Sequence, residues 1–368
     1  MTRPPRYASV VLAMLVAVVL VAPALQSQER LVGLLVAPFD GPSPLARKAA
    51  TVLHLQTWQT LRMAATVNNR SLSFGRGIVQ WTEESPPKTH AEALALLAGS
   101  ASQMTLWGRA QEFGAGVVVQ AYLSVADADG SIDTNANFWR LTPEELPAAE
   151  RTISVALPAT LFEFGAIVLK PDVIPVLSTQ VGIPVYRDRT FTQQIGALSG
   201  DFTALEQGPN MARVRVAGVS EPGWVRMPGL SNNRSEVTDF AGGVIRILRR
   251  DWSGAIDLLS RVTNTTSAPV SIRVSSYQMM AAASQLLHDQ AGTPNRSVEY
   301  AEAAEKLNPY LRETVKYKCM ALLADNHLPA ATKKLEETVR ASSYLFPKND
   351  PWLDKVRRIV VSRQTLKK

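Results

Sequence analysis

The segment MTLWGRAQEFGAGVVVQAYLSV, residues 104–125, decides the fold of the first half of the chain. Two runs of β-prone residues flank Gly114-Ala115-Gly116. Glycine adopts the positive φ that a tight turn between antiparallel strands requires. The pattern therefore predicts a β-hairpin at 104–125, to which the neighbouring segments must be fitted.

The segments before the hairpin alternate between strand and helix patterns. Residues 31–39 form a continuous apolar run closed by Asp-Gly-Pro, which is typical of a buried strand. Apolar residues then recur at helical spacing over 45–65, residues 71–81 indicate a second strand, and 89–98 a second helix. These segments predict an α/β unit with a mixed sheet. Because apolar strands and helices need a shared core, we expect the helices to cover one face of that sheet.

Two further units follow. Residues 152–157 indicate an added strand, and 162–169 a segment that packs beneath the sheet. Prolines punctuate 166–182 and predict a linker. Residues 183–230 contain short β-prone runs separated by Gly, Pro and Asn, which predict a small barrel, and the helical period prevails over 236–345. We therefore predict a multidomain protein with three independent cores: α/β, small β-barrel and all-α array.

The first unit, residues 30–165, resembles the amino-terminal domain of TolB and the related domains of bacterial envelope and flagellar accessory proteins. The resemblance rests on VAPF at 36–39, on a first helix that carries Trp58, and on LWGRAQEFGAGVVVQAYLSV at 106–125. It implies an α/β fold that contacts other envelope proteins. It supplies no catalytic residues.

Residues 183–230 resemble a bacterial SH3-type domain. The matching positions are Ile195-Gly196, Val214-Arg215-Val216 and Gly223-Trp224-Val225, whereas the usual Asn-Val-Arg-Ser-Gly-Pro opening is replaced by residues 184–188. Cell-wall binding is common among such domains. Tyr186 and Trp224 are the candidate binding residues, because aromatic rings offer large contact area at low entropic cost. The alternative for Trp224 is that it fills the barrel core.

Residues 236–345 resemble about three tetratricopeptide repeats. Small residues lie twelve positions apart at Gly243 and Ala255, and again at Cys319 and Ala331, as they do where the two helices of such a repeat cross closely. The resemblance implies a concave groove lined by inner helices. The candidate groove residues are Phe240, Val244, Ile247, Lys316, Met320 and Leu323. The alternative is that the apolar ones pack between repeats.

The amino terminus has the pattern of an export signal. Arg3 and Arg6 precede an apolar run at 10–25 that contains Ala22-Pro23-Ala24, so we predict a cleavable signal peptide at 1–24 and a periplasmic or secreted protein. No transmembrane segment is expected after cleavage. The formal charge of +7 is mildly basic, and basic residues crowd the predicted tail at 346–368, where they suit an anionic surface.

The sequence predicts no catalytic site, metal site or cofactor. It has one cysteine and four scattered histidines, and the phosphate-binding, dinucleotide-binding and hydrolase motifs are absent. The leading hypothesis is a non-enzymatic envelope scaffold or adaptor whose partners are other envelope proteins. The alternative is an accessory factor that binds peptidoglycan through the SH3-type unit. We expect no nucleic-acid partner.

Overall fold

The computed structural model describes residues 33–47, 49–50, 79–82, 85–98, 100, 102–114, 116–126, 138–169, 183–198, 202–208, 211–216, 218–226, 236–340, 345–347 and 350–366. The predicted signal peptide, most of the helix predicted at 45–65 and most of the strand predicted at 71–81 lie outside these residues. Within the described ranges, no helix combines the length and the apolar character needed to cross a membrane.

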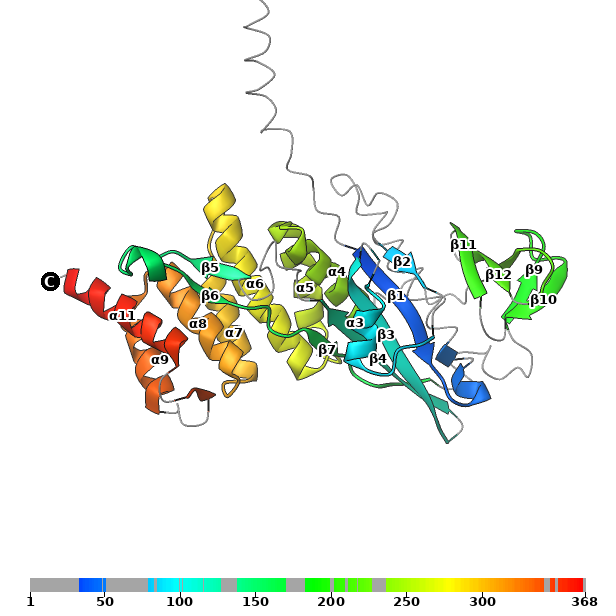
Figure 1. Cartoon of the computed structure of the whole chain (residues 1–368), viewed down its shortest axis with the longest axis horizontal. Helices are drawn as coiled ribbons and strands as arrows, with labels where there is room; N and C mark the ends of the chain where they lie inside the picture. The colour runs from blue at the N-terminus through cyan, green and yellow to red at the C-terminus, as the bar shows by residue number, and fades with distance from the viewer. Residues whose placement is uncertain are drawn as a thin grey trace, which may run out of the picture. The chain divides into compact units, whose positions relative to one another are not determined.

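A six-stranded mixed sheet contains the predicted hairpin (Figure 1). The order β2-β1-β3-β4-β7 has parallel pairing on both sides of β1 and antiparallel pairing from β3 onward, and β8 also pairs with β4. The hairpin is confirmed: its register runs from Met104 opposite Val125 to Phe113 opposite Gly116, and Gly114 has a φ of 59°. The strands are β1 (Gly33–Asp40), β2 (Val79–Trp81), β3 (Ser102–Phe113), β4 (Gly116–Val125), β7 (Leu161–Glu163) and β8 (Ile167–Leu169).

Helices cover both faces of this sheet, so the expectation of a single covered face is wrong. On one face, helix α3 (His90–Ala95) buries Ala93 against Ala37 and Trp107. Leu106, the neighbour of Trp107 on β3, points to the other face and belongs to the core shared with the carboxy-terminal helices. The apolar pattern of β3 fits burial on both sides, and the sequence alone does not reveal what covers each side.

The second half of the chain is the predicted array of helices, in which consecutive helices pack against one another. The first two cross closely at Gly243, where an added Cβ would lie 2.6 Å from Leu259 Cδ2. This close approach explains the small residue at that position. The helices are α4 (Glu236–Leu248), α5 (Trp252–Asn264), α6 (Val270–Ala291), α7 (Ser297–Leu307), α8 (Arg312–Ala324), α9 (Leu328–Arg340) and α11 (Pro351–Leu366).

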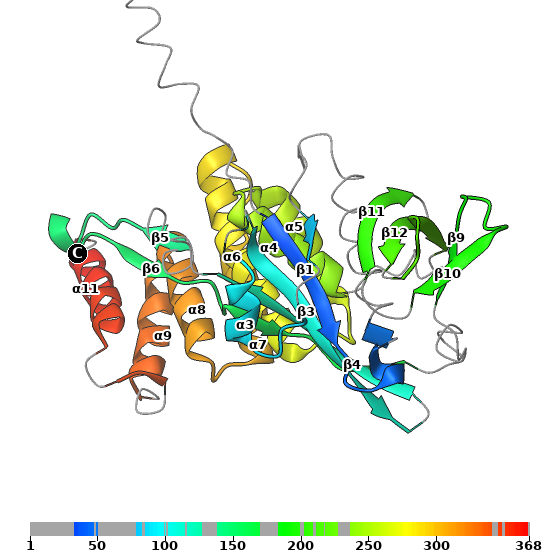
Figure 2. The same cartoon turned by 45° about the vertical axis from the view of Figure 1, so that its right-hand side comes forward.

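Residues 138–157, which we call the arm, connect the sheet to the far end of the helical array. The arm contains β5 (Trp139–Leu141), the 3₁₀ turn Ala148–Glu150 and β6 (Ile153–Val155), and its strands pair only with each other in the described chain (Figure 2). The strand expected at 152–157 therefore exists, but it does not join the large sheet. Tyr317 Oη donates to the Ala156 carbonyl at 2.8 Å, and Trp352 Nε1 donates to that of Ser154 at 2.7 Å.

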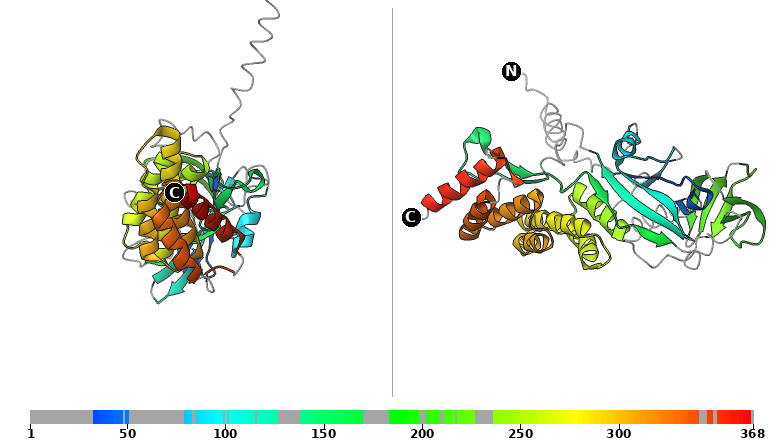
Figure 3. Two further views of the ribbon diagram at one scale, coloured as in Figure 1. Left: turned by 90° about the vertical axis from the view of Figure 1, so that its left-hand side faces the viewer. Right: turned by 90° about the horizontal axis from the view of Figure 1, so that it is seen from below.

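The predicted basic tail at 346–368 contains helix α11, which packs against the arm (Figure 3). Its basic residues have partners within the protein: Arg358 pairs with Glu150, and Arg363 Nε lies 2.6 Å from Glu145 Oε1. Burial raises the pKa of Glu145, but the hydrogen bond and charge of Arg363 outweigh it, and the net pKa is lowered. The expectation of a free tail that serves an anionic surface is therefore wrong for these residues.

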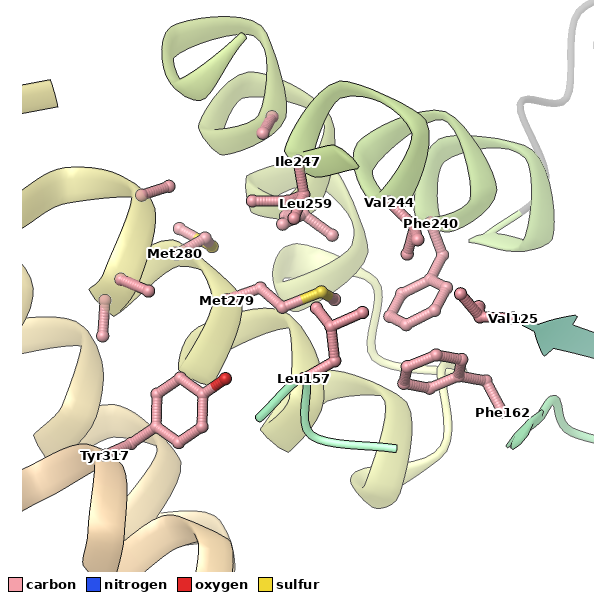
Figure 4. Packing of buried hydrophobic residues seen from close by; sticks show 14 of the residues in the cluster. Val125, Leu157, Phe162, Phe240, Val244, Ile247, Leu259, Met279, Met280 and Tyr317 are labelled. Carbon is pink, nitrogen blue, oxygen red and sulfur yellow. The ribbon is translucent and has the colours of Figure 1, made fainter. Parts of the chain in front are cut away.

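One continuous core joins the sheet to the helices, so the expectation of three independent cores is wrong. Phe240 of α4 meets Phe162 and Phe164 at ring-centroid distances of 4.9 and 5.6 Å, and both contacts are edge-to-face. Leu157 and Met279 lie beside this aromatic cluster (Figure 4). Because β7 and β8 bring the chain back along β4, the linker predicted at 166–182 begins with a paired strand.

Residues 183–226 form a second, curled sheet. Its order is β10-β9-β13-β12-β11 with antiparallel pairing throughout, and within the described residues the two edge strands do not pair to close a full barrel. Its inner face buries Val185, Val214, Val216 and Val225. The strands are β9 (Ile183–Tyr186), β10 (Gln194–Leu198), β11 (Phe202–Gly208), β12 (Met211–Val216) and β13 (Gly223–Arg226).

We predict that Phe240→Ala lowers the free energy of unfolding by about 3–5 kcal/mol, because it removes a fully buried ring and leaves a cavity. The loss should appear equally in urea melts followed by helix and by sheet signals, since both parts share that core. Phe113→Ala is the matched control: its ring is 69% exposed, so its effect should stay within about 0.5 kcal/mol. Loss confined to the helix signal would contradict a shared core.

A second prediction concerns the contact between α11 and the arm. Arg363→Met leaves the mostly buried Glu145 carboxylate without its cation and should cost roughly 3 kcal/mol of stability, measured by urea unfolding. Arg357→Met removes an exposed partner of Asp354 on the same helix and should cost less than about 1 kcal/mol. Equal effects of the two substitutions would show that the Glu145 pair does not hold α11 in place.

Candidate binding surface

The structure does not bring the predicted groove residues to an open surface. Five of them are each at most 2% exposed and belong to the core: Phe240, Val244 and Ile247 (Figure 4), and also Met320 and Leu323. The alternative that these apolar residues pack inside therefore describes them correctly.

Lys316, the remaining groove candidate, is half-buried, with its Nζ 5.6 Å from the centre of the Trp352 ring. Burial and then the charge of Arg312 lower its pKa. Its ammonium thus lies against α11 and is not presented in an open concave groove.

Tyr186 and Trp224 are brought together on the outer face of the curled sheet. In the strand register, Trp224 lies opposite Tyr186 on one side and Arg213 on the other. Residues paired across antiparallel strands project to the same face, so these three lie opposite the inner valines. Trp224 is only 6% exposed, and the Arg189 guanidinium lies 4.3 Å from its ring centroid. Trp224 is thus a buried side chain that lies beneath Arg189 on the face opposite the inner valines.

Arginine and aromatic side chains alternate across this outer surface. The Arg226 guanidinium lies 4.6 Å from the Phe191 ring centroid, and Phe191 meets Tyr186 edge-on at 5.4 Å. Such cation–π contacts hold a guanidinium in place while its N–H groups remain able to bind anions. Arg189, Arg215 and Arg226 are exposed. We define the arginine face as Arg189, Arg213, Arg215 and Arg226 together with Tyr186, Phe191 and Trp224.

The turn between β9 and β10 is held by one aspartate. Asp188 accepts hydrogen bonds from the Thr190 backbone N–H at 2.8 Å, from the Thr190 hydroxyl, and from the Thr192 hydroxyl at 3.1 Å. The hydrogen bond of the Thr190 hydroxyl is the main cause that lowers the pKa of Asp188. Phe191 has a φ of 59°, an uncommon conformation for a bulky residue. This turn therefore fixes the positions of Arg189 and Phe191.

The described residues do not assemble a metal centre. They contain no group of three or more His, Cys, Asp or Glu side chains placed to hold a metal. Cys319 is fully buried, and burial raises the pKa of its thiol to about 12, which keeps it protonated and unreactive.

One cleft, of about 570 Å³, lies where the arm meets α6, α8 and α11. Its lining includes Glu145 and Arg363, which pair with each other, and Asp289, which accepts from Gln285. These charged groups are engaged in structural contacts, so the cleft does not present an acid, a base and a nucleophile that converge on one point.

Comparison with known proteins identifies no relative: no protein-family model matches the chain, and neither curated proteins nor solved structures show significant similarity to it. The interpretation of the site therefore depends on its geometry.

Sequence reasoning identified the two aromatic candidates of the curled sheet but missed the arginines around them. A signal was present in ARVRV at 212–216, where valines alternate with arginines. Period-2 alternation in a half-buried strand places one residue type inside and the other outside. Arg189 and Phe191 had no such signal, because their positions depend on the turn that Asp188 holds.

We predict that Thr190→Val raises the pKa of Asp188 toward that of an ordinary aspartate, since the substitution removes the hydroxyl donor and retains the backbone donor. The measurement is an NMR pH titration with carboxyl-labelled aspartate. Because the native pKa is lowered, the turn is stabilised at neutral pH, and this contribution is lost as pH falls through that native pKa. Thr142→Val, a change in the arm, is the control. An unchanged Asp188 pKa would contradict this account of the turn.

Proposed function

We propose that this protein is an exported, non-enzymatic adaptor that holds a component of the bacterial envelope on its arginine face. The main observation that supports this proposal is that three exposed arginines and several aromatic rings in contact with them lie on one side of the curled sheet. Preorganised guanidinium groups on a rigid sheet form a surface suited to binding anionic groups. Export is inferred from the signal-like pattern at 1–24.

The rest of the described chain supports a scaffold role. The inner positions of the helical array that we expected to grip a partner are buried in the core. The arm, in turn, is fastened to α8 and α11 by hydrogen bonds from Tyr317 and Trp352. The proposed adaptor therefore uses the helices and the large sheet as a rigid body and the arginine face as its contact surface. The resemblances to TolB-type, SH3-type and tetratricopeptide modules remain part of this proposal.

A peptidoglycan-binding accessory factor is the second candidate. It is favoured by the resemblance of residues 183–230 to a bacterial SH3-type domain and by the arginine face itself, since wall peptides carry carboxylates. In this candidate the arginine face binds the wall polymer and not a partner protein, and the protein is thereby retained on the cell wall.

The test of the proposed function compares two forms of the full-length protein in its native host. Arg215→Gln combined with Arg226→Gln removes two exposed guanidinium groups, and the control Arg140→Gln changes an exposed arginine of the arm. We expect in-cell cross-linking to trap an envelope protein with the wild type and the control but to lose at least about nine-tenths of that product with the double variant. A factor of ten corresponds to about 1.4 kcal/mol.

Sedimentation with purified sacculi separates the two candidates. Retention that disappears in the double variant, without a cross-linked protein, would replace the adaptor with the wall-binding factor. Cross-linking and sedimentation that are both unaffected by the double variant would refute any binding role of the arginine face.

A further inference from the structure

We propose that the cleft between the arm and helices α6, α8 and α11 binds a small aliphatic amine, whose ammonium group is held at the carboxylate of Asp289. This inference goes beyond the proposed function, because it concerns a separate site and uses no residue of the arginine face. It rests on the walls of the cleft, on acceptor groups with unused capacity, and on the charge that surrounds them.

The walls of the cleft suit a short aliphatic chain. Apolar residues of the arm, α8 and α11 contribute to its lining: Leu141, Pro143, Leu323, Ala324 and Ile359. An apolar body gains free energy when it leaves water for such walls. The volume of about 570 Å³ falls within the range of small-molecule sites. The cleft is therefore large enough for a whole small molecule and not only for one side chain.

Two polar side chains of the lining have unused hydrogen-bonding capacity. Asp289 Oδ1 accepts from Gln285 Nε2 at 2.7 Å, whereas Asp289 Oδ2 has no hydrogen-bond partner among the described residues. Asn326 is exposed, and its side chain makes no hydrogen bond within the same part of the chain. Both residues line the cleft. Carboxylate and side-chain amide oxygens accept hydrogen bonds, so they match an ammonium group, which has three donors and no acceptor.

The charge of the lining favours a cation over an anion. The lining contains the carboxylates of Glu145 and Asp289 and the guanidinium of Arg363. Arg363 Nε pairs with Glu145 Oε1 at 2.6 Å, and Arg363 Nη1 donates to the Leu323 carbonyl at 2.9 Å. Because Arg363 neutralises Glu145, the charge of Asp289 is left without a cation among the lining residues. A positively charged ligand supplies one.

The ends of two helices strengthen this preference. Asp289 lies in the last turn of α6, and Asn326 follows the end of α8. The carbonyl end of a helix carries a partial negative charge, so a cation is stabilised there. Arg363 shows this chemistry within the protein, since it binds a carbonyl in the last turn of α8. The second oxygen of Glu145 is buried and has no hydrogen-bond partner in the described chain, and a positive charge in the adjoining cleft stabilises it as well.

The test follows the methyl signal of Ile359 by NMR in the full protein lacking residues 1–24, while pentylamine or 1-pentanol is added. The two probes have the same alkyl chain, and only pentylamine is charged at neutral pH. We expect pentylamine to shift the Ile359 signal and to bind at least about fivefold more tightly than 1-pentanol. This advantage should shrink as the salt concentration rises, because salt screens the charge of Asp289.

Two variants locate the ammonium group. Asp289→Asn removes the charge and keeps the size of the side chain, so it should weaken pentylamine binding about fivefold and leave 1-pentanol binding unchanged. Asn326→Gly removes the amide and retains the φ of 56°, and it should weaken pentylamine binding about threefold. Asp257→Asn, at an exposed position of α5, is the control and should have no effect. Urea unfolding with a wild-type midpoint confirms that each variant is folded.

Four outcomes would overturn the inference. Equal affinity for pentylamine and 1-pentanol would show that the charge of the ligand has no role. Unchanged pentylamine binding in Asp289→Asn would place the ammonium group elsewhere. An Ile359 signal that moves with neither probe would show that the cleft is not a ligand site. Tighter binding of Nα-acetyl-lysine amide than of pentylamine would replace the small amine with a lysine side chain of a partner protein. None of these variants alters the arginine face, so this inference and the proposed function can fail separately.

Discussion

The contact of Phe240 with Phe162 and Phe164 is the constraint on which the rest of the structure depends. It attaches the first helix of the array to the edge of the large sheet, and edge-to-face pairs of this kind each contribute about 0.5–1.5 kcal/mol beyond the burial of their area. Once α4 is fixed there, the helices that follow pack in sequence away from the sheet. The arm then has to run along them to reach α8 and α11, and this places Trp139 against Tyr317 at 5.9 Å.

Local patterns predicted the elements well and their partners poorly. The hairpin at 104–125 follows from its glycines, and Gly243 marked the close crossing of two helices correctly, because both requirements are met within a short stretch of chain. The contact between the arm and α11 was not anticipated. Arg363 pairs with Glu145, 218 positions away. The residues next to Arg363 and Glu145 do not indicate that the two form a pair. A basic helix without its acidic partner in view is indistinguishable from a free tail.

At the candidate site, too, the residue types were predicted better than their tertiary surroundings. Aromatic residue type was enough to select Tyr186 and Trp224, and strand pairing then showed that both project from the same side. The predicted groove was wrong for the opposite reason. Residues such as Val244 and Met320 have the spacing of groove residues, but an apolar side chain at that spacing also suits a core, and the rest of the chain covers them. Only tertiary packing separates these alternatives.

The sole thiol of the chain has a practical consequence. Cys319 has no accessible surface, and the raised pKa of its thiol, about 12, keeps the nucleophilic thiolate scarce. A maleimide or an oxidant therefore modifies this position only in molecules that have opened around α8. The rate at which Cys319 is labelled therefore reports how often the helical array opens, and no engineered cysteine is needed for this measurement.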